Sequence, residues 1–310
     1  MQFLREVVRS GYPQRLAALA DGYCLTIDPD QVRAEARFLA GELAAFEIRH
    51  DPAYIEVMCA FRQLMIPVDD PALGRALTRS YLIPMLVDDE CDESRTAYRG
   101  LETAMLKGVA RPRHGLALVS SALHPQSAYT EHMFNELSRF CSPAFLSVRK
   151  AFYYQAFTGV VLESGYTPDA RDDIDTEYVR RRSGYGEFFA TALAVAYGCL
   201  DFERNIPLWG ATLSSWVDFF NDINDLMSCY KETLGGEFPV NSIYRKAVQN
   251  GLPLMDSYEA AFRRGVANYH RIHDLGSSEQ RPLLLHYLQG YVHWHLTSDR
   301  YRWGEFTALT

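Results

Sequence analysis

The chain has 310 residues, 48% of them hydrophobic and 13% aromatic, which is enough for one large buried core or two small ones. Its formal net charge of −8 argues against a general nucleic-acid-binding protein, because such proteins carry a surplus of basic residues. The 6 cysteines form no CxxC pair, which excludes a zinc ribbon and a dithiol redox motif and is typical of isolated thiols in a reducing compartment.

We expect neither a signal peptide nor a membrane span. The opening residues "MQFLREVVRS" carry Arg and Glu and lack a long apolar stretch. The longest nearly uncharged apolar run, at 188–200, is too short to cross a bilayer and predicts a buried helix. The sequence therefore predicts a cytoplasmic protein.

Helical periodicity dominates the chain. Residues 28–50 open with Asp-Pro-Asp and then space their apolar residues by three and four, which predicts a capped helix. Residues 143–163 and 281–306 predict two more long helices, each with a proline in its first turn. No repeat and no linker divides the chain, so we predict an all-α protein of roughly ten helices in a single domain, residues 1–310.

The first acidic motif, "LVDDECDES", covers residues 86–94. On a helix, Asp88 and Asp92 lie about 40° apart and Asp89 lies about 60° beyond Asp92, so three carboxylates share one sector. Such a cluster suits Mg²⁺, which takes hard oxygen ligands and shares them with substrate phosphates. An acidic helix end that faces water explains the same spacing. Pro84 lies four residues before the motif and predicts a kink in its helix.

The second motif, "NDLMSCYKE", covers residues 224–232. Asn224, Ser228 and Glu232 step by four, so an amide, a hydroxyl and a carboxylate oxygen lie within about 80° of one another on a helix. Lys231 lies about 20° from Asn224 on the other side, which favours a site for a metal together with a phosphate. A polar helix face is the alternative. A third acidic run, at 171–177, could mimic a metal motif, but it lies in a proline-containing loop and is interpreted as a solvated helix entry.

Together the two motifs resemble the aspartate-rich motif and the (N/D)Dxx(S/T)xxxE motif of class I terpene cyclases. The C-terminal segment "GYVHWHLTSDRYR" (290–302) is similar to the matching segment of the fungal trichodiene synthase group. The resemblance extends from about residue 60 to the C-terminus. It implies a class I terpenoid synthase-like helical bundle around a central apolar cavity.

The resemblance also implies how these residues act. A cluster of three Mg²⁺ ions would bridge both motifs to a prenyl diphosphate, which the pair Arg300 and Tyr301 would hydrogen-bond. An arginine on a helix that breaks just downstream would sense the diphosphate. In "VRRRSGYGEFF" (179–189), the family spacing favours Arg180, with the break at Gly184, and Arg181 is the alternative. Without this context, the Arg180–Arg182 triplet would be interpreted as a solvated basic turn.

A terpene cyclase must also protect a carbocation from water. An apolar cavity excludes water, and aromatic faces stabilise positive charge by about 0.5–2 kcal/mol each. We expect Tyr81, Phe157 and Trp294 to line the cavity. Tyr81 precedes Asp88 by two helical turns and so faces the same side. For most of these aromatics taken singly, plain core packing is the better explanation. The wider set of candidates also contains Phe61, Phe152 and Tyr291.

We therefore predict a Mg²⁺-dependent lyase that converts farnesyl diphosphate to a sesquiterpene and releases pyrophosphate. One alternative is a chain-elongating prenyl diphosphate synthase, a group that carries a second Asp-rich motif where this chain has Asn224, Ser228 and Glu232. Another is a non-catalytic helical protein that binds isoprenoids. The predicted partner is the prenyl diphosphate, without nucleic acid or a membrane span, and a homodimeric assembly is compatible with the sequence.

Overall fold

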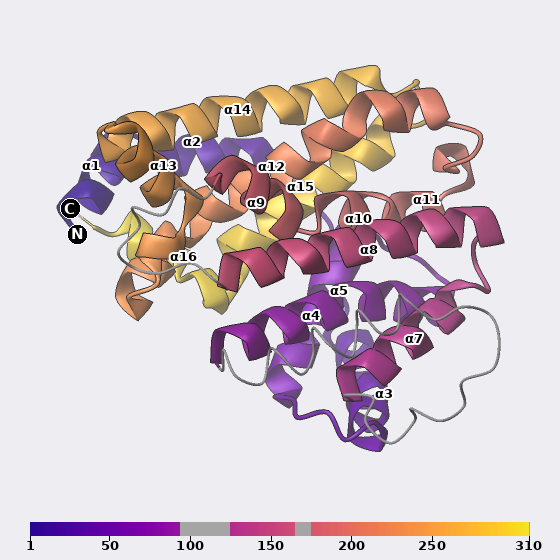
Figure 1. Ribbon diagram of the computed structural model, residues 1–310. Helices are drawn as coiled ribbons and strands as arrows, with labels where there is room; N and C mark the ends of the chain where they lie inside the picture. The colour runs from indigo at the N-terminus through magenta and orange to yellow at the C-terminus, as the bar shows by residue number, and fades with distance from the viewer. Residues whose placement is uncertain (94–124, 165–174, 310) are drawn as a thin grey trace. The chain divides into compact units, whose positions relative to one another are not determined.

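The structure is a computed structural model that describes residues 1–93, 125–164 and 175–309 (Figure 1). Within these ranges the regular secondary structure is helical and contains no strand, so the prediction of an all-α protein is confirmed. The α-helices are α1 (Gln2–Arg9), α2 (Tyr12–Ala17), α3 (Pro29–Ala45), α4 (Pro52–Met65), α5 (Pro71–Glu93), α7 (Pro125–Leu137), α8 (Pro143–Ser164), α9 (Thr176–Ser183), α10 (Gly186–Ala190), α11 (Ala192–Ala196), α12 (Ile206–Gly235), α13 (Ser242–Asn250), α14 (Leu254–Leu275), α15 (Arg281–Thr297) and α16 (Trp303–Thr307). The 3₁₀ turns are η1 (Ala18–Ala20), η3 (Gly198–Leu200), η4 (Phe238–Val240) and η5 (Asp299–Tyr301).

The chain divides into two compact units. Unit 1 contains Met1–Thr26, Leu64–Ile66 and Phe152–Thr310, and unit 2 contains Ile27–Gln63 and Pro67–Ala151. The second motif, the arginine triplet and the Arg-Tyr pair belong to unit 1, whereas the first acidic motif belongs to unit 2. That residues 1–310 form a single domain stays a prediction.

Helix α12 is the long central element of unit 1. Pro207 lies in its first turn, where the missing N–H has no helical partner to lose, and Gly236 ends it in the left-handed region at φ 80°. Most of the helix is buried, and it packs along α14 and against α10 (Figure 1). Because α12 carries the second motif, its packing decides where those side chains lie.

The N-terminal segment of unit 1 packs against helices from the far end of the chain. The Tyr269 hydroxyl on α14 donates to the Leu19 carbonyl at 3.0 Å, and the Gln289 amide on α15 donates to the Asp21 carbonyl at 2.8 Å. Tyr12 on α2 meets the Phe262 ring edge-on at 5.3 Å. Helices α1 and α2 therefore share one core with α14 and α15, which come from the last third of the chain.

Unit 2 is held by ion pairs between its helices. Arg79 on α5 donates to both carboxylate oxygens of Glu42 on α3, at 2.9 and 2.5 Å. The Tyr129 hydroxyl on α7 donates to the same carboxylate at 3.2 Å. Arg79 is only 2% exposed, and a buried charge is costly unless it is paired. The two hydrogen bonds to Glu42 and the opposite charge of that carboxylate offset this cost. These bonds tie α3, α5 and α7 together.

The predicted helix at 143–163 is confirmed by α8. The helix predicted at 28–50 ends earlier, because α3 stops at Ala45 and Glu47 adopts a left-handed φ of 59°. The prediction of one buried helix at 188–200 is wrong, since α10, α11 and η3 replace it. The Thr191 hydroxyl donates to the Glu187 carbonyl at 2.8 Å, and side-chain bonds of this kind bend helices.

The prediction of one helix over 281–306 is also wrong beyond Thr297. Ser298 is extended, with φ −75° and ψ 129°, and its hydroxyl accepts from the Arg300 N–H. Arg302 then takes a left-handed φ of 52° before α16 begins. Arg300 and Tyr301 therefore lie on the short turn η5 rather than at the end of a long helix.

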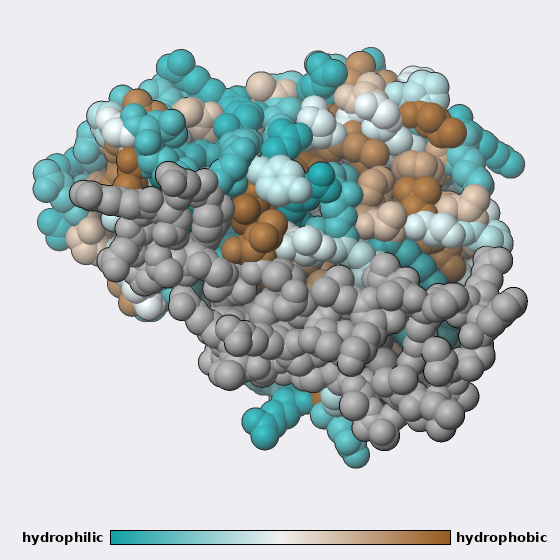
Figure 2. All heavy atoms as spheres, viewed as in Figure 1, coloured by the Kyte–Doolittle hydropathy of each residue, from teal (hydrophilic) through white to brown (hydrophobic). Residues whose placement is uncertain are grey.

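No helix among the described residues is long and apolar enough to cross a membrane. On the face shown in Figure 2, apolar residues are scattered among hydrophilic ones.

Candidate functional site

Three aspartates of α12 are each paired with an arginine from another helix. Their spacing of four and three residues places them along one side of α12. This paired row was not predicted from the sequence, although its spacing of four and three residues is visible there. It ties α9 and α14 to α12. The pairs are Asp218 with Arg181 of α9 at 2.9 Å, Asp222 with Arg264 of α14 at 2.5 Å, and Asp225 with Arg180 of α9 at 2.7 Å.

Arg180 lies in the most polar part of this arrangement. Its guanidinium donates to both oxygens of Asp225, at 2.7 and 3.2 Å, and to the Asn224 amide oxygen at 3.1 Å. Burial alone would lower the pKa of Arg180, but the charges of Asp225 and Glu163 raise it above its ordinary value. The guanidinium is therefore permanently charged and is held in place through several hydrogen bonds.

The other two arginines of the triplet point elsewhere. Arg181 pairs with Asp218 and donates to the Ser214 hydroxyl at 3.1 Å, with a side chain that is 38% exposed. The Arg182 guanidinium lies over the Tyr178 ring at 5.3 Å. Of the three, Arg180 is the one in contact with the second motif.

Gly184 lets the end of α9 approach α12 very closely. A Cβ atom at this position would lie 1.7 Å from the Asn221 amide oxygen. Asn221 in turn donates to the Arg180 carbonyl at 2.8 Å, which holds the last turn of α9 against α12. Sequence analysis assigned no role to Asn221. Gly184 has a φ of −78°, so glycine is needed here for the close approach of the two helices and not for a left-handed turn.

Asn224, Ser228 and Glu232 form a second row on α12, called the open row here. The Asn224 amide nitrogen lies 3.3 Å from the Tyr301 hydroxyl, and Glu232 accepts from the Asn241 amide at 2.7 Å. The Ser228 hydroxyl is buried and lies close enough to the Glu232 carboxylate to lower the pKa of that group, although it forms no hydrogen bond of ordinary length among the described residues. Burial raises the pKa of Glu232, so its charged form lacks full compensation.

The C-terminal turn brings Tyr301 to the open row. Tyr301 is 3% exposed, and its ring lies edge-on to Trp294 at 5.1 Å. The Lys231 ammonium lies 5.7 Å from the centre of the same ring, whereas Arg300 is exposed. Arg180, Asn224 and Tyr301 therefore come together from α9, α12 and η5.

The first acidic motif lies on α5, as predicted, and α5 continues through Pro84. The side chains of Asp88, Asp89 and Asp92 lie outside the described part of the structure. Of the acidic run at 171–177, Asp175 is described and caps α9 by accepting from the Tyr178 N–H at 3.0 Å. This agrees with a helix entry.

No family model matches the sequence. Terpene synthase BipA of Cochliobolus sativus is 28% identical over 137 residues, which are 43% of this chain and 41% of that protein. Monoterpene synthase 25 of Postia placenta is 26% identical over 116 residues, 36% of this chain and 35% of that protein. The chain thus spans about two fifths of the length of the curated relatives it matches.

Solved structures match much more of the chain. 2-Methylisoborneol synthase from Streptomyces coelicolor, in complex with Mg²⁺ and geranyl-S-thiolodiphosphate, gives a TM-score of 0.70 at 16% identity and covers 90% of this chain and 96% of that one. Linalool/nerolidol synthase from Streptomyces clavuligerus gives 0.67 at 15% identity, over 88% and 98%. The chain has a terpene synthase fold. Its grouping with the fungal trichodiene synthases stays a prediction.

The open row of this terpene synthase fold suits a divalent cation. Its oxygens come from an amide, a hydroxyl and a carboxylate, which are hard ligands of the kind Mg²⁺ prefers. The pKa of Glu232 is raised by burial even with the Ser228 hydroxyl beside it, and a bound cation would relieve this. Among the described residues, no group of three or more His, Cys, Asp or Glu is arranged to hold a metal. The open row contains only one residue of these four types, Glu232, because its other two members are Asn224 and Ser228.

The aromatic residues predicted for a terpene synthase cavity are mostly buried. Tyr81 is fully buried in unit 2 and meets Phe61 edge-on at 5.2 Å. In unit 1, Phe157 and Trp294 are buried, and the Tyr291 hydroxyl donates to the Phe220 carbonyl at 3.1 Å. Phe152 is partly exposed. That these rings face a carbocation stays a prediction.

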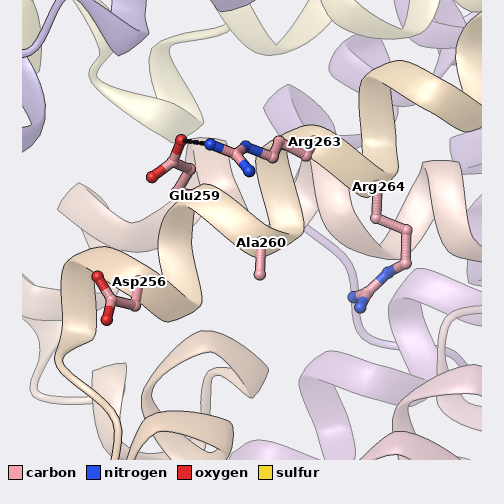
Figure 3. Close-up of a pocket in the computed structure, with 5 residues that line it drawn as sticks. All are labelled: Asp256, Glu259, Ala260, Arg263 and Arg264. Atoms are coloured by element: carbon pink, nitrogen blue, oxygen red, sulfur yellow. Dashed lines mark hydrogen bonds and ion pairs between the residues drawn. The ribbon is translucent and has the colours of Figure 1, made fainter.

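A depression of about 580 Å³ lies on the surface of α14 and is lined by residues of that helix (Figure 3). Figure 3 shows a dashed contact between Glu259 and Arg263, four residues apart on the same helix. Arg264 also lines the depression, but its guanidinium is paired with Asp222. We assign no ligand to this depression. Its lining residues are Asp256, Glu259, Ala260, Arg263 and Arg264.

Proposed function

We propose that this protein is a Mg²⁺-dependent class I terpene cyclase that ionises farnesyl diphosphate, cyclises the carbocation to a sesquiterpene and releases pyrophosphate. One observation carries the proposal. The Asn224 amide contacts Arg180 through its oxygen and Tyr301 through its nitrogen. Three segments that the sequence separately assigned to diphosphate or metal binding thus meet at one side chain. A helical protein without this chemistry would have no reason to gather them.

The metal ligands in this proposal come from both motifs. Asn224, Ser228 and Glu232 would hold Mg²⁺ on the α12 side, and Asp88, Asp89 and Asp92 would do so on α5, with three ions in total. The bound ions supply Lewis-acid neutralisation of the diphosphate oxygens. This also explains how a chain with a net charge of −8 binds a polyanion.

Positively charged and hydroxyl groups of the chain would stabilise the leaving group. Ionisation breaks the carbon–oxygen bond to the diphosphate, which keeps the electron pair, and leaves an allylic cation. Arg180 and Arg300 would donate charge-assisted hydrogen bonds to the diphosphate as its charge grows, and Tyr301 and Lys231 would add donors. Arg181 is the alternative to Arg180, although it contacts Asp218 and Ser214 and not the second motif. Gly184 allows α9 to carry Arg180 to this position.

The hydrocarbon part of the substrate would be enclosed by aromatic side chains. Tyr81, Phe157 and Trp294 would shield the cation from water and stabilise it through their ring faces. The choice of a C15 substrate rests on the family resemblance and the size of the chain. One relative is named a monoterpene synthase, so the C10 substrate geranyl diphosphate is the alternative to test beside farnesyl diphosphate.

The proposed activity is tested by incubating the purified protein with Mg²⁺ and farnesyl, geranyl or geranylgeranyl diphosphate in parallel. Gas chromatography with mass spectrometry identifies hydrocarbons or alcohols, and a coupled assay follows pyrophosphate. We expect cyclic C15 products from farnesyl diphosphate. A longer prenyl diphosphate, formed when isopentenyl diphosphate is added, would instead indicate chain elongation. Absence of both products and pyrophosphate would contradict an enzymatic role.

Glu232→Gln is expected to raise the Mg²⁺ requirement and to lower turnover at least tenfold, about 1.4 kcal/mol. The substitution keeps the shape of the side chain but removes the only charge of the open row. Turnover is measured against Mg²⁺ concentration. Glu237→Gln is the matched control, because Glu237 is exposed just beyond the end of α12. An unchanged Mg²⁺ dependence in folded Glu232→Gln would remove Glu232 from the site.

Ser228→Ala should separate metal binding from folding. Because the Ser228 hydroxyl forms no hydrogen bond of ordinary length among the described residues, its removal should change the metal-free Tm little. The rise in Tm on adding Mg²⁺ and pyrophosphate should shrink, since one ligand is lost. Differential scanning calorimetry measures both, with Ser215→Ala on the same helix as control. A full ligand-induced rise in Ser228→Ala would exclude this hydroxyl as a ligand.

A further inference from the structure

His295 lies beside the open row but was assigned no role by the sequence. It belongs to α15 and is 0% exposed. Its ring centre lies 4.3 Å from that of Tyr301 and 4.9 Å from that of Trp294. A polar ring in such surroundings must have its two nitrogens satisfied by specific partners.

The hydrogen bonds of His295 determine its tautomer. Nδ1 lies 2.8 Å from the Tyr291 carbonyl oxygen, which can only accept, so Nδ1 carries the hydrogen. Because Arg180 donates to the Asn224 oxygen, the Asn224 amide nitrogen faces Nε2 and donates to it, so Nε2 is the unprotonated nitrogen. Nε2 then has a lone pair and acts as an acceptor.

This acceptor faces the amide of Asn224. The Asn224 nitrogen lies 3.4 Å from His295 Nε2 and 3.3 Å from the Tyr301 hydroxyl, while its oxygen lies 3.1 Å from Arg180 Nη2. Arginine has donors only. If the amide were turned by half a rotation, two N–H groups would face each other at Arg180 and two lone pairs at His295. One amide orientation is thus strongly favoured.

We infer that His295 is a positioning residue that orients the Asn224 amide, so that its single oxygen faces Arg180 and the metal site of the open row. The inference rests on the proposed function, because it assigns Asn224 as a metal ligand. A carboxylate at this position would offer two equivalent oxygens, whereas an amide offers one and must be turned correctly. His295 acts through Asn224 and touches neither metal nor diphosphate.

The test compares two substitutions that keep different nitrogens of the ring. His295→Asn keeps a donor near the Nδ1 position and loses the acceptor at Nε2, whereas His295→Gln reaches the Nε2 position with an amide oxygen. The readout is isothermal titration calorimetry of pyrophosphate at increasing Mg²⁺ concentrations, which needs no turnover. His295→Asn should raise the Mg²⁺ concentration for half-maximal pyrophosphate binding about tenfold, as outer-shell substitutions do. His295→Gln should stay within about twofold of wild type.

Two controls distinguish orientation from packing. His293→Asn makes the same exchange two residues away, where the ring centre lies 4.9 Å from that of Tyr23, and should leave Mg²⁺ dependence unchanged. In an Asn224→Asp background, the effect of His295→Asn should shrink to less than about twofold, because a carboxylate needs no orientation. A loss of packing alone would be the same in both backgrounds.

An equal tenfold loss with Asn224 and with Asp at position 224 would overturn the inference, and so would wild-type binding in His295→Asn. If His295→Asn does not fold, His295→Gln decides: binding within about twofold of wild type supports the acceptor role, and a loss of tenfold or more overturns it. Failure of the wild-type protein to bind pyrophosphate with Mg²⁺ would refute the proposed function itself, which is a distinguishable result.

Discussion

Arg180→Lys is expected to lower the rate of pyrophosphate release at least a hundredfold, about 2.7 kcal/mol in the activation free energy. The guanidinium reaches Asp225 with two nitrogens and Asn224 as well, and a single ammonium cannot reproduce this fork. The loss should also lower the free energy of unfolding, because Asp225 is 4% exposed and would keep a poorer partner. Steady-state kinetics and thermal unfolding measure the two effects.

Arg182→Lys is the matched control for this prediction. It makes the same exchange two residues away, on a side chain that lies over the Tyr178 ring. We expect turnover within about threefold of wild type, because a cation–π contact with the exposed Tyr178 ring is worth only about 0.5–1 kcal/mol. Equal small effects at positions 180, 181 and 182 would show that Arg180 has no special role in turnover.

Gly184→Ala is expected to destabilise the protein by about 2 kcal/mol or more and to reduce turnover strongly. The added Cβ would lie 1.7 Å from the Asn221 amide oxygen, so either α9 or the Asn221 side chain must move. Movement of α9 would break the bond from Asn221 to the Arg180 carbonyl and would shift Arg180 itself. Chemical denaturation and pyrophosphate release are the two measurements.

Gly210→Ala provides the control, because Gly210 lies on α12 and a Cβ there meets nothing within 4 Å. That substitution should stabilise the protein by up to about 1 kcal/mol through helix propensity. Adding Asn221→Ala to Gly184→Ala should restore part of the lost stability, because it removes the atom that clashes. Gly184→Ala with wild-type stability and turnover would refute the close approach as the reason for glycine.

The sequence predicted helices well where caps and periodicity agree. The proline at the start of α8 and the Asp-Pro-Asp at the start of α3 mark helix beginnings, because each satisfies the geometry of a first turn. It failed at 188–200 and beyond Thr297. In these two regions the helices are broken by the Thr191 hydroxyl, the Ser298 cap and the left-handed Arg302. The spacing of apolar residues does not predict such breaks.

The site was predictable to the extent that it follows from spacing along one helix. The positions of Asn224, Ser228 and Glu232 on α12 follow from steps of four. What spacing could not show is which arginine of the triplet meets them, because that depends on how α9 packs on α12. Asn221 and His295 were missed for the same reason: each acts through a partner that is more than 40 residues away in the sequence.

The packing of the N-terminal segment has a consequence for synthesis of the chain. Leu19 and Asp21 receive their hydrogen bonds from residues 250 and 268 positions later. At about 5–20 residues per second, the first helices leave the ribosome roughly 12–50 seconds before these partners exist. During that interval the apolar side chains of Leu4, Val7 and Leu16, all buried in the finished protein, have nothing from α14 or α15 to cover them. The earliest-made part of unit 1 is thus among the last to reach its final surroundings, and shielding by a chaperone is most useful there.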